Sequence, residues 1–196
     1  MKFPLSIVPL LLMTSLAAER RRGNPTDHLP KNMEDRTGSA PIYSVGEDLD
    51  MSGITDVDPY LHVRGAAQAI DFYKRVFEAE ELFRLTDPAG RIGHAEIRIG
   101  GKVLMIADEH PEYGVKGPET LGGTSIALHL RVDNVDALVA LAVEAGAIVL
   151  REVEDQFYGE RSGTLRDPFG HEWMLGQEIE KVSPEEMQRR FDAMFV

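Results

Sequence analysis

The chain has 196 residues, of which 43% are hydrophobic, and it carries a formal net charge of −12 with no cysteine. This length and composition predict one or two small globular domains, and the acidic balance argues against binding to nucleic acid, whose phosphates need a basic face. The lack of cysteine excludes disulfides, thiolate metal sites and a cysteine nucleophile.

The N-terminal segment differs in composition from the rest of the chain. Residues 1–18 are apolar after Lys2 and end in small residues, which is typical of a secretory signal peptide and shorter than a membrane span. The arginines at 20–22 oppose export, so the alternative is a wrongly assigned start and a cytoplasmic protein. Residues 19–52 are polar and rich in proline and glycine, which predicts a disordered linker. In neither case do we expect an integral membrane protein.

The folded domain is expected at residues 53–180, and its first unit spans residues 54–109. We expect a strand at 58–63, an amphipathic helix at 66–77 and strands at 82–86, 91–99 and 102–107. Turns are expected at Asp87-Pro88-Ala89-Gly90 and at Gly100-Gly101, because proline fixes φ and glycine accepts positive φ.

The second unit, residues 124–178, repeats this order. We expect a strand at 125–132, a helix at 135–145 and strands at 148–153, 164–166 and 171–177, with a loop at 156–163. The loop at 108–123 between the units is either a lid or a plain connector. After the domain, Ser183-Pro184-Glu185-Glu186 opens a predicted amphipathic helix at 183–195.

A short repeat relates the two units. Leu61-His62-Val63-Arg64 returns as Leu128-His129-Leu130-Arg131 at the same place in the second unit. Two similar units indicate a duplication, and small-molecule sites tend to lie where such halves join.

Several short sequence motifs resemble those of one known superfamily. They are Asp58-Pro59-Tyr60-Leu61, Ala69-Ile70-Asp71-Phe72-Tyr73, Gly93-His94-Ala95-Glu96-Ile97, the run from Asp155 to Gly163, Asp167-Pro168-Phe169-Gly170-His171-Glu172-Trp173 and Ser183-Pro184-Glu185-Glu186-Met187. Together they resemble the vicinal oxygen chelate (VOC) superfamily of glyoxalases, bleomycin-resistance proteins and extradiol dioxygenases, and in particular its phosphonate-operon-type glyoxalase-like branch. The resemblance implies an α+β fold in which tandem βαβββ units form a β-cup, and a homodimer.

The resemblance also points to four metal-ligand positions, on the first and last strands of each unit. They fall at Asp58, Met105, Ala127 and Met174, where metal-dependent members carry histidine or glutamate. Two thioethers and a methyl group are not ligands for a hard divalent ion. We therefore predict no metal and no other cofactor at these positions.

Polar residues near these positions suggest a shifted site. Residues two apart on a strand share a face, so His62 and His129 face the same side as Asp58 and Ala127. If the faces converge, His62, His129 and Glu96 are candidates for acid–base catalysis or for binding a divalent metal. The alternative is that the histidines are hydrogen-bonded walls of a polar cavity. Tyr60 and His94 are predicted to contact the ligand.

The segment at 156–163 supplies the other candidate residues. Phe157 and Tyr158 beside Arg161 suit a planar or anionic ligand, with rings for stacking and a guanidinium for a carboxylate. The alternative is that Tyr158 fastens the loop to its own domain and Arg161 pairs with Glu160 or Asp155. His171 is expected to have a structural role, bonding to nearby backbone.

Two functions remain open. One is a glyoxalase-like lyase or isomerase that uses His62, His129 and Glu96 as acids and bases. The other is a non-catalytic binding protein of the bleomycin-resistance type, for which the acidic balance suits cationic, planar ligands. Both place a small-molecule ligand in the cavity between the units.

Overall fold

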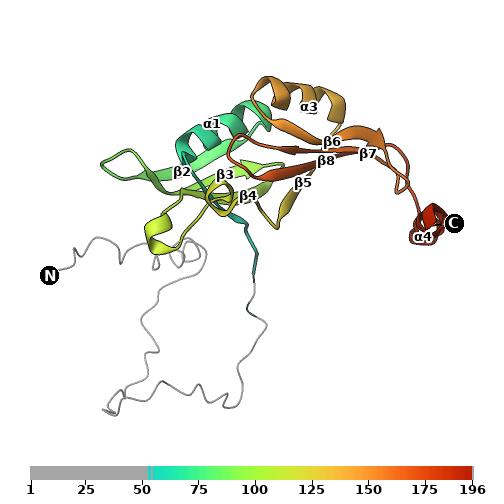
Figure 1. Ribbon diagram of the computed structural model, residues 1–196, viewed down its shortest axis with the longest axis horizontal. Coiled ribbons are helices and arrows are strands. Elements are labelled where there is room, and N and C mark those ends of the chain that lie inside the picture. Colours follow the sequence, from blue (N-terminus) through green and yellow to red (C-terminus); the bar gives the residue numbers. More distant parts are fainter. Residues whose placement is uncertain (1–52, 54, 196) are drawn as a thin grey trace, which may run out of the picture. The chain divides into compact units, whose positions relative to one another are not determined.

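The computed structural model describes residue 53 and residues 55–195 (Figure 1). The predicted signal peptide and linker lie outside these residues. In the part of the chain so described, no helix is long and apolar enough to cross a bilayer.

The described chain contains the same unit twice, each a strand, a helix and three strands. The first unit consists of β1 (Tyr60–Val63), α1 (Ala66–Val76), β2 (Glu80–Thr86), β3 (Ile92–Ile99) and β4 (Lys102–Asp108). The second consists of β5 (Ala127–Arg131), α3 (Val135–Glu144), β6 (Ile148–Asp155), β7 (Glu160–Arg166) and β8 (Glu172–Glu178). This arrangement confirms the predicted α+β fold of tandem βαβββ units.

Each unit forms its own four-stranded mixed sheet. The strand orders are β1-β4-β3-β2 and β5-β8-β7-β6, so the first strand of each unit lies parallel to the last and at the sheet edge. The helices α1 and α3 lie on the same side of the strands (Figure 1). The opposite face of each sheet is thereby left open for polar side chains.

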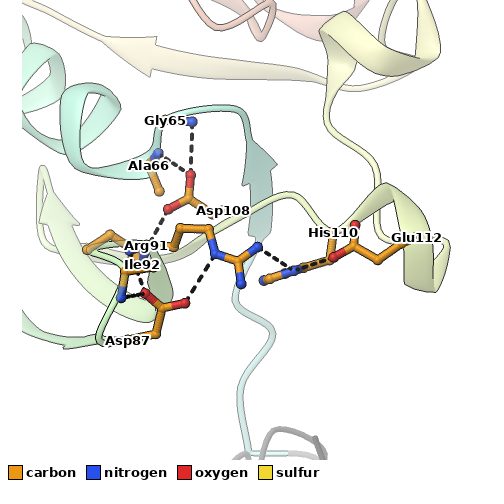
Figure 2. Close-up of polar contacts among 9 residues, drawn as sticks. Gly65, Ala66, Asp87, Arg91, Ile92, Asp108, His110 and Glu112 are labelled. Atoms are coloured by element: carbon orange, nitrogen blue, oxygen red, sulfur yellow. Dashed lines mark hydrogen bonds and ion pairs between the residues drawn. The ribbon is translucent and has the colours of Figure 1, made fainter.

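Helix α1 is capped by a residue from another strand. Its N-cap, Gly65, has a left-handed φ of 83° and offers no side chain. The carboxylate of Asp108, at the end of β4, accepts hydrogen bonds from the backbone N–H groups of Gly65 and Ala66, each at 2.9 Å, and from that of Ile92 at 2.7 Å (Figure 2). One buried side chain thus joins the start of α1 to both β3 and β4, and its negative charge suits a helix N-terminus.

Helix α3 is more peripheral. Its N-cap is its own Asn134, whose side chain accepts a hydrogen bond from the N–H of Ala137 at 3.0 Å. Only Val135 and Ala142 of α3 are buried, whereas six residues of α1 are: Ala66, Ala69, Ile70, Phe72, Tyr73 and Val76.

Aromatic rings join the two units. Phe77, just after α1, lies 4.5 Å from Trp173 of β8 between ring centroids, and Tyr73 lies 5.3 Å from the same ring. Phe72 also contacts Phe169, in the turn before β8. The buried core therefore runs through both units, with α1 between them.

Asp167, in the turn between β7 and β8, is the polar centre of this core. Its Oδ1 accepts hydrogen bonds from the backbone N–H groups of Phe169 and His171, both at 2.9 Å. Its Oδ2 accepts one from the hydroxyl of Tyr73 at 2.7 Å and one from the indole of Trp173 at 2.9 Å. The carboxylate is buried and fully hydrogen-bonded, as a buried charge must be.

The segment between the units, residues 109–126, is called the connector below. It contains a 3-10 turn at Pro111–Tyr113 and the short helix α2 (Pro118–Leu121). Glu109 fixes it, accepting hydrogen bonds from Arg64, Thr120 and the N–H of Gly117 at 3.0, 2.8 and 2.9 Å. A Cβ at Gly117 would lie 2.6 Å from the carbonyl oxygen of His62. The connector is therefore packed closely against β1.

The chain ends in helix α4 (Pro184–Asp192) and a 3-10 turn at Ala193–Phe195. Ser183 accepts a hydrogen bond from the N–H of Glu186 at 3.2 Å, which places the N-cap where the sequence suggests it. Phe191 contacts the ring of Phe157, and Arg190 donates to the Phe157 carbonyl at 3.1 Å. Helix α4 is thus attached to the turn between β6 and β7.

One predicted loop is wrong. Residues 160–163 were expected to belong to a loop at 156–163, but they form the first half of β7, and β6 extends to Asp155. The polar run Glu160-Arg161-Ser162-Gly163 lacks an apolar alternation, although Ser162 and Gly163 are buried in the strand. Ser162 accepts a hydrogen bond from Arg151, and Arg161 donates to Asp136.

Candidate functional site

Polar side chains gather on the open face of the first sheet. Along β3, Ala95, Ile97 and Ile99 are buried in the core, whereas the alternate residues His94 and Glu96 point to the other face. Tyr60 of β1 reaches His94 on that face. Three of the residues predicted for the site, Tyr60, His94 and Glu96, are therefore brought together.

Tyr60, His94 and Glu96 form a short polar chain. The Tyr60 hydroxyl lies 2.9 Å from Nδ1 of His94, and Nε2 of His94 lies 3.7 Å from Glu96 Oε1. Burial raises the pKa of Tyr60, so its hydroxyl stays protonated. When the His94 proton is on Nε2, the hydroxyl donates a hydrogen bond to Nδ1. Tyr60 and His94 are thus joined by a hydrogen bond, whereas Glu96 lies near His94 but beyond hydrogen-bond distance.

His62 lies beside this chain. Its ring stacks on Tyr60 with centroids 4.8 Å apart, and its Nδ1 is buried without a hydrogen-bond partner. Burial lowers the pKa of His62, and the nearby His110 lowers it further. His110 in turn contacts Arg91 at 3.5 Å and Glu112 at 3.4 Å (Figure 2). His62 is therefore a neutral imidazole at neutral pH.

The open face of the second sheet carries a separate polar pair. Nε2 of His129 lies 3.7 Å from Glu160 Oε2. Both groups lie over Gly176, since a Cβ at that position would meet Glu160 at 2.6 Å and His129 at 2.8 Å. His129 thus meets the carboxylate of Glu160 on its own sheet, and within the described chain it forms no hydrogen bond or ion pair with His62, Tyr60 or Glu96, so the structure does not bring the predicted trio His62, His129 and Glu96 together.

A cavity of about 320 Å³ lies between the units, bounded by β1, the connector and the start of β5 and β8. Its polar lining includes Tyr60, His62, Lys116, His171 and Glu172. Its apolar lining is formed by Pro59, Leu61, Pro118, Leu121, Ile126 and Leu128. The volume and the mixture of apolar walls with a few polar groups are typical of small-molecule sites.

His171 bonds to nearby backbone through its carbonyl oxygen, which accepts from the N–H of Asp167 at 2.9 Å, and it also lines the cavity. Its Nδ1 is buried without a hydrogen-bond partner, 4.0 Å from Asp167 Oδ2, and its side chain is only 10% exposed. Burial lowers the pKa of His171, opposed by the charge of Asp167 and reinforced by His62. His62 and His171 are therefore electrostatic neighbours on the wall of one cavity.

The predicted aromatic–arginine cluster is divided by the sheet. Arg161 donates two hydrogen bonds to Asp136 of α3, each 2.8 Å, and one to Asp155 at 3.0 Å. Tyr158 instead meets Ser162 at 3.0 Å between hydroxyl oxygens. The guanidinium of Arg161 is thus held by two carboxylates, whereas the Phe157 ring packs on α4. None of these three residues lines the cavity.

The four positions that the resemblance assigns to metal ligands do not fit a metal. Met105 lies opposite Tyr60 and Glu96, and Met174 lies opposite His129, so both thioethers occupy the open faces where carboxylates are expected. Ala127 offers a methyl group, and only Asp58 offers an oxygen ligand. Within residue 53 and residues 55–195, no three histidine or acidic side chains converge into a metal-binding group.

Sequence reasoning missed Lys116 and the cavity-lining role of His171. Lys116 lies in the connector and His171 in a turn. Neither segment has a helical or strand periodicity, so the sequence does not indicate where these side chains point. The one available signal was composition, since a long loop that joins two halves often lines the site between them.

Comparisons with known proteins agree with this geometry. Residues 57–175 match the model of the glyoxalase/bleomycin resistance protein/dioxygenase superfamily. An uncharacterized protein of Mycobacterium tuberculosis is 45% identical over 146 residues, which cover 73% of this chain and 86% of that protein.

Two solved structures show the same architecture. The Arabidopsis thaliana gene product At5g48480 is 26% identical with a TM-score of 0.53, over 63% of this chain and 98% of the other. The fosfomycin resistance protein FosX of Listeria monocytogenes, solved with Mn(II) and sulfate, is 18% identical with a TM-score of 0.51, over 72% of this chain and 98% of the other. The likeness to FosX extends to the fold alone.

Proposed function

Because the chain belongs to the glyoxalase/bleomycin resistance protein/dioxygenase superfamily, we propose that its tandem units bind a small organic molecule in the cavity between them, without a metal at the family's ligand positions. The observation that carries this proposal is the cavity itself. It joins Tyr60 and His62 of the first unit to His171 and Glu172 of the second, and apolar side chains form the rest of its wall. A site of this size suits a ligand of about ten to fifteen non-hydrogen atoms.

A thermal-shift screen tests the proposal. A library of small organic acids, amines and neutral compounds is added to metal-free protein, and compounds that raise Tm are retested on two variants. Ile126→Arg places a long charged side chain at the cavity, whereas Ile179→Arg changes another exposed isoleucine outside it, with 47% exposure against 69% for Ile126. Ligands should stabilise the native protein and Ile179→Arg but not Ile126→Arg, since only binding to the native state raises Tm. Equal shifts in both variants, or no shift with any compound, would contradict the proposal.

A second candidate is metal-independent acid–base catalysis through Tyr60, which lines the cavity, whereas His94 and Glu96 stand behind it and are not among the lining residues. The observation in its favour is the hydrogen bond between Tyr60 and His94, with Glu96 beyond it. In this step the Tyr60 oxygen would take a proton from carbon next to a carbonyl group while its own proton moves to Nδ1 of His94, and the reverse movement would return a proton to carbon, which is the proton transfer of many isomerases and lyases.

Deuterium exchange distinguishes a catalyst from a binder. Small α-hydroxy carbonyl compounds are incubated with chelator-treated protein in D₂O, and exchange is followed by NMR. His94→Gln and Glu96→Gln should slow exchange by about 10²–10⁴ if the chain carries the proton, whereas Arg98→Gln, on the same strand but paired with Glu80, should not. Exchange that survives both substitutions, or that requires added metal, would count against this candidate.

A further inference from the structure

We propose that the cavity takes the carboxylate of a small, largely apolar monocarboxylic acid, held by the imidazoles of His62 and His171 and the ammonium group of Lys116. This inference rests on the proposed function, since it names the class of ligand for the same cavity. It concerns residues from three segments, β1, the connector and the turn before β8, that meet only in the folded chain.

His62 and His171 both line the cavity. Nδ1 of His62 and Nδ1 of His171 are buried and have no hydrogen-bond partner. Nδ1 of His62 has no acceptor nearby, so the proton of its neutral ring belongs on Nε2. Nδ1 of His171 lies 4.0 Å from the Asp167 carboxylate, which favours a proton on that nitrogen. A carboxylate bound here would accept from Nε2–H of His62 and, once His171 takes up a proton and carries N–H on both nitrogens, from His171 as well.

The charges around the cavity favour an anion over a cation. Lys116 is exposed and makes no ion pair with any residue of the described chain, so its charge is available to a ligand. Glu172, the acidic residue of the lining, is already bound to Arg166 at 2.8 Å. The chain's net charge of −12 opposes an anion at long range, but screening limits that field to about 8–10 Å at physiological salt. The lining groups therefore decide which charge binds.

The remaining lining suits an apolar body behind the carboxylate. Leu61, Pro118, Leu121 and Leu128 contribute carbon surface, and they come from both units and the connector. Burying an apolar ring or chain against them supplies binding free energy that a bare oxyanion cannot gain. A fatty or aromatic acid should therefore bind more tightly than acetate or inorganic phosphate.

Binding of an anion here should be linked to proton uptake. The titratable groups around the imidazoles are Tyr60 and His110 near His62, Asp167 near His171, and each imidazole for the other; Lys116 and Glu172 are the charged residues of the shared lining. Burial holds the pKa of both rings below its ordinary value. A carboxylate bound between them raises both pKa values, so the affinity should increase as the pH falls.

Three ligands of the same size separate the possibilities by calorimetry: benzoate, benzamide and benzylamine. Benzoate should bind about tenfold or more tightly than the other two, and its Kd should decrease between about pH 7.5 and about pH 5.5. Lys116→Gln and His62→Gln should each weaken benzoate binding by about five- to tenfold, and Lys116→Glu should reverse the preference toward benzylamine. Lys102→Gln, an exposed lysine at the β3–β4 hairpin, is the matched control and should bind as the native protein does.

The outcomes distinguish this inference from the function on which it rests. Thermal unfolding confirms that each variant is folded, and NMR of the histidine rings shows whether His62 and His171 shift on adding benzoate. Tighter binding of benzylamine or benzamide overturns the anion inference and leaves small-molecule binding in place. Benzoate binding that Lys116→Gln and His62→Gln leave unchanged also overturns it. If none of the three binds while another library compound does, the carboxylate inference alone fails. If no compound of the library binds, both the carboxylate inference and the proposed small-molecule binding fail.

Discussion

Two turns of the same sequence type have different roles in the two units. Asp87-Pro88-Ala89-Gly90 and Asp167-Pro168-Phe169-Gly170 are built alike: in each, Oδ1 of the aspartate accepts the backbone N–H groups two and four residues ahead at 2.9 Å. The other oxygen differs. In Asp87 it meets the exposed Arg91 at 3.1 Å, whereas in Asp167 it meets the buried Tyr73 and Trp173.

The difference shows that one local motif can serve either a hairpin or the whole fold. Asp87 stabilises only the turn in which it lies. Asp167 joins a helix of the first unit to a strand of the second, because its free oxygen faces the shared core. The energetic importance of the motif therefore depends on what faces its second oxygen and cannot be read from the motif itself.

Removing the two aspartates tests this comparison most strongly. Asp167→Ala leaves the Tyr73 hydroxyl and the Trp173 indole without acceptors in the core, and we expect it to lower the free energy of unfolding by about 4 kcal/mol. Asp87→Ala, at an exposed turn, should cost about 1 kcal/mol. Urea unfolding of both variants measures the two losses. Equal losses would show that the connection between the units contributes nothing beyond the turn.

Aromatic contacts sharpen the same contrast between joined and peripheral elements. Phe77→Ala removes a buried ring that lies 4.5 Å from Trp173, and it should cost about 3 kcal/mol. Leu141→Ala, on the outer side of α3 where the leucine is 39% exposed, should cost less than about 1 kcal/mol. Thermal unfolding gives both values, and a larger effect at Leu141 would contradict the central place of α1.

Two tyrosine hydroxyls form hydrogen bonds of different kinds: that of Tyr73 joins the two units, and that of Tyr158 lies within the second unit. Tyr73→Phe leaves the Asp167 carboxylate with one donor fewer in the core, and we expect a loss of about 1–2 kcal/mol. Tyr158→Phe removes a partly buried contact with Ser162 inside the second unit and should cost about 0.5 kcal/mol. A double-mutant cycle of Tyr73→Phe with Asp167→Ala should show strong coupling. Additive losses would argue against a direct bond.

The smallest expected effect concerns pH. The pKa values of His62 and His171 are lowered in the folded protein, so the unfolded chain binds more protons as the pH falls below about 6.5. The stability that these rings contribute is thus present above that pH and is lost progressively toward about pH 5. His62→Gln and His171→Gln should flatten the dependence of unfolding free energy on pH between about 7 and about 5. If neither substitution changes the slope of unfolding free energy against pH, that pH dependence arises from other titratable groups.

Local patterns predicted most of the fold. The apolar stripe of α1, the glycine pair between β3 and β4, with φ of 53° and 81°, and the two aspartate–proline turns all act within a few residues. The tandem order of strands and helices followed from them.

The site was less predictable because it depends on distant partners. Strand alternation placed His94 and Glu96 on one face, but that Tyr60 of β1 reaches His94 there is visible only in the structure. Arg161 resembled a ligand anchor, yet it is bound by Asp136, which lies 25 residues away along the chain. Lys116 and His171 reach the cavity from turns, where no periodicity sets the direction of a side chain.

The separation of the two sheets has a consequence for assembly. Strands β1 and β5 are both sheet edges, and no hydrogen-bonded ladder links the two sheets within residues 55–195. The units are instead joined by rings, by Asp167 and by the connector. The same side-chain contacts could form between two units of one polypeptide or between units of two polypeptides. Which pairing forms would then depend on the effective concentration of one unit near the other, which the connector sets. A change in the length of the connector would therefore shift the balance between pairing within one chain and pairing between two chains without altering any residue of the contact itself.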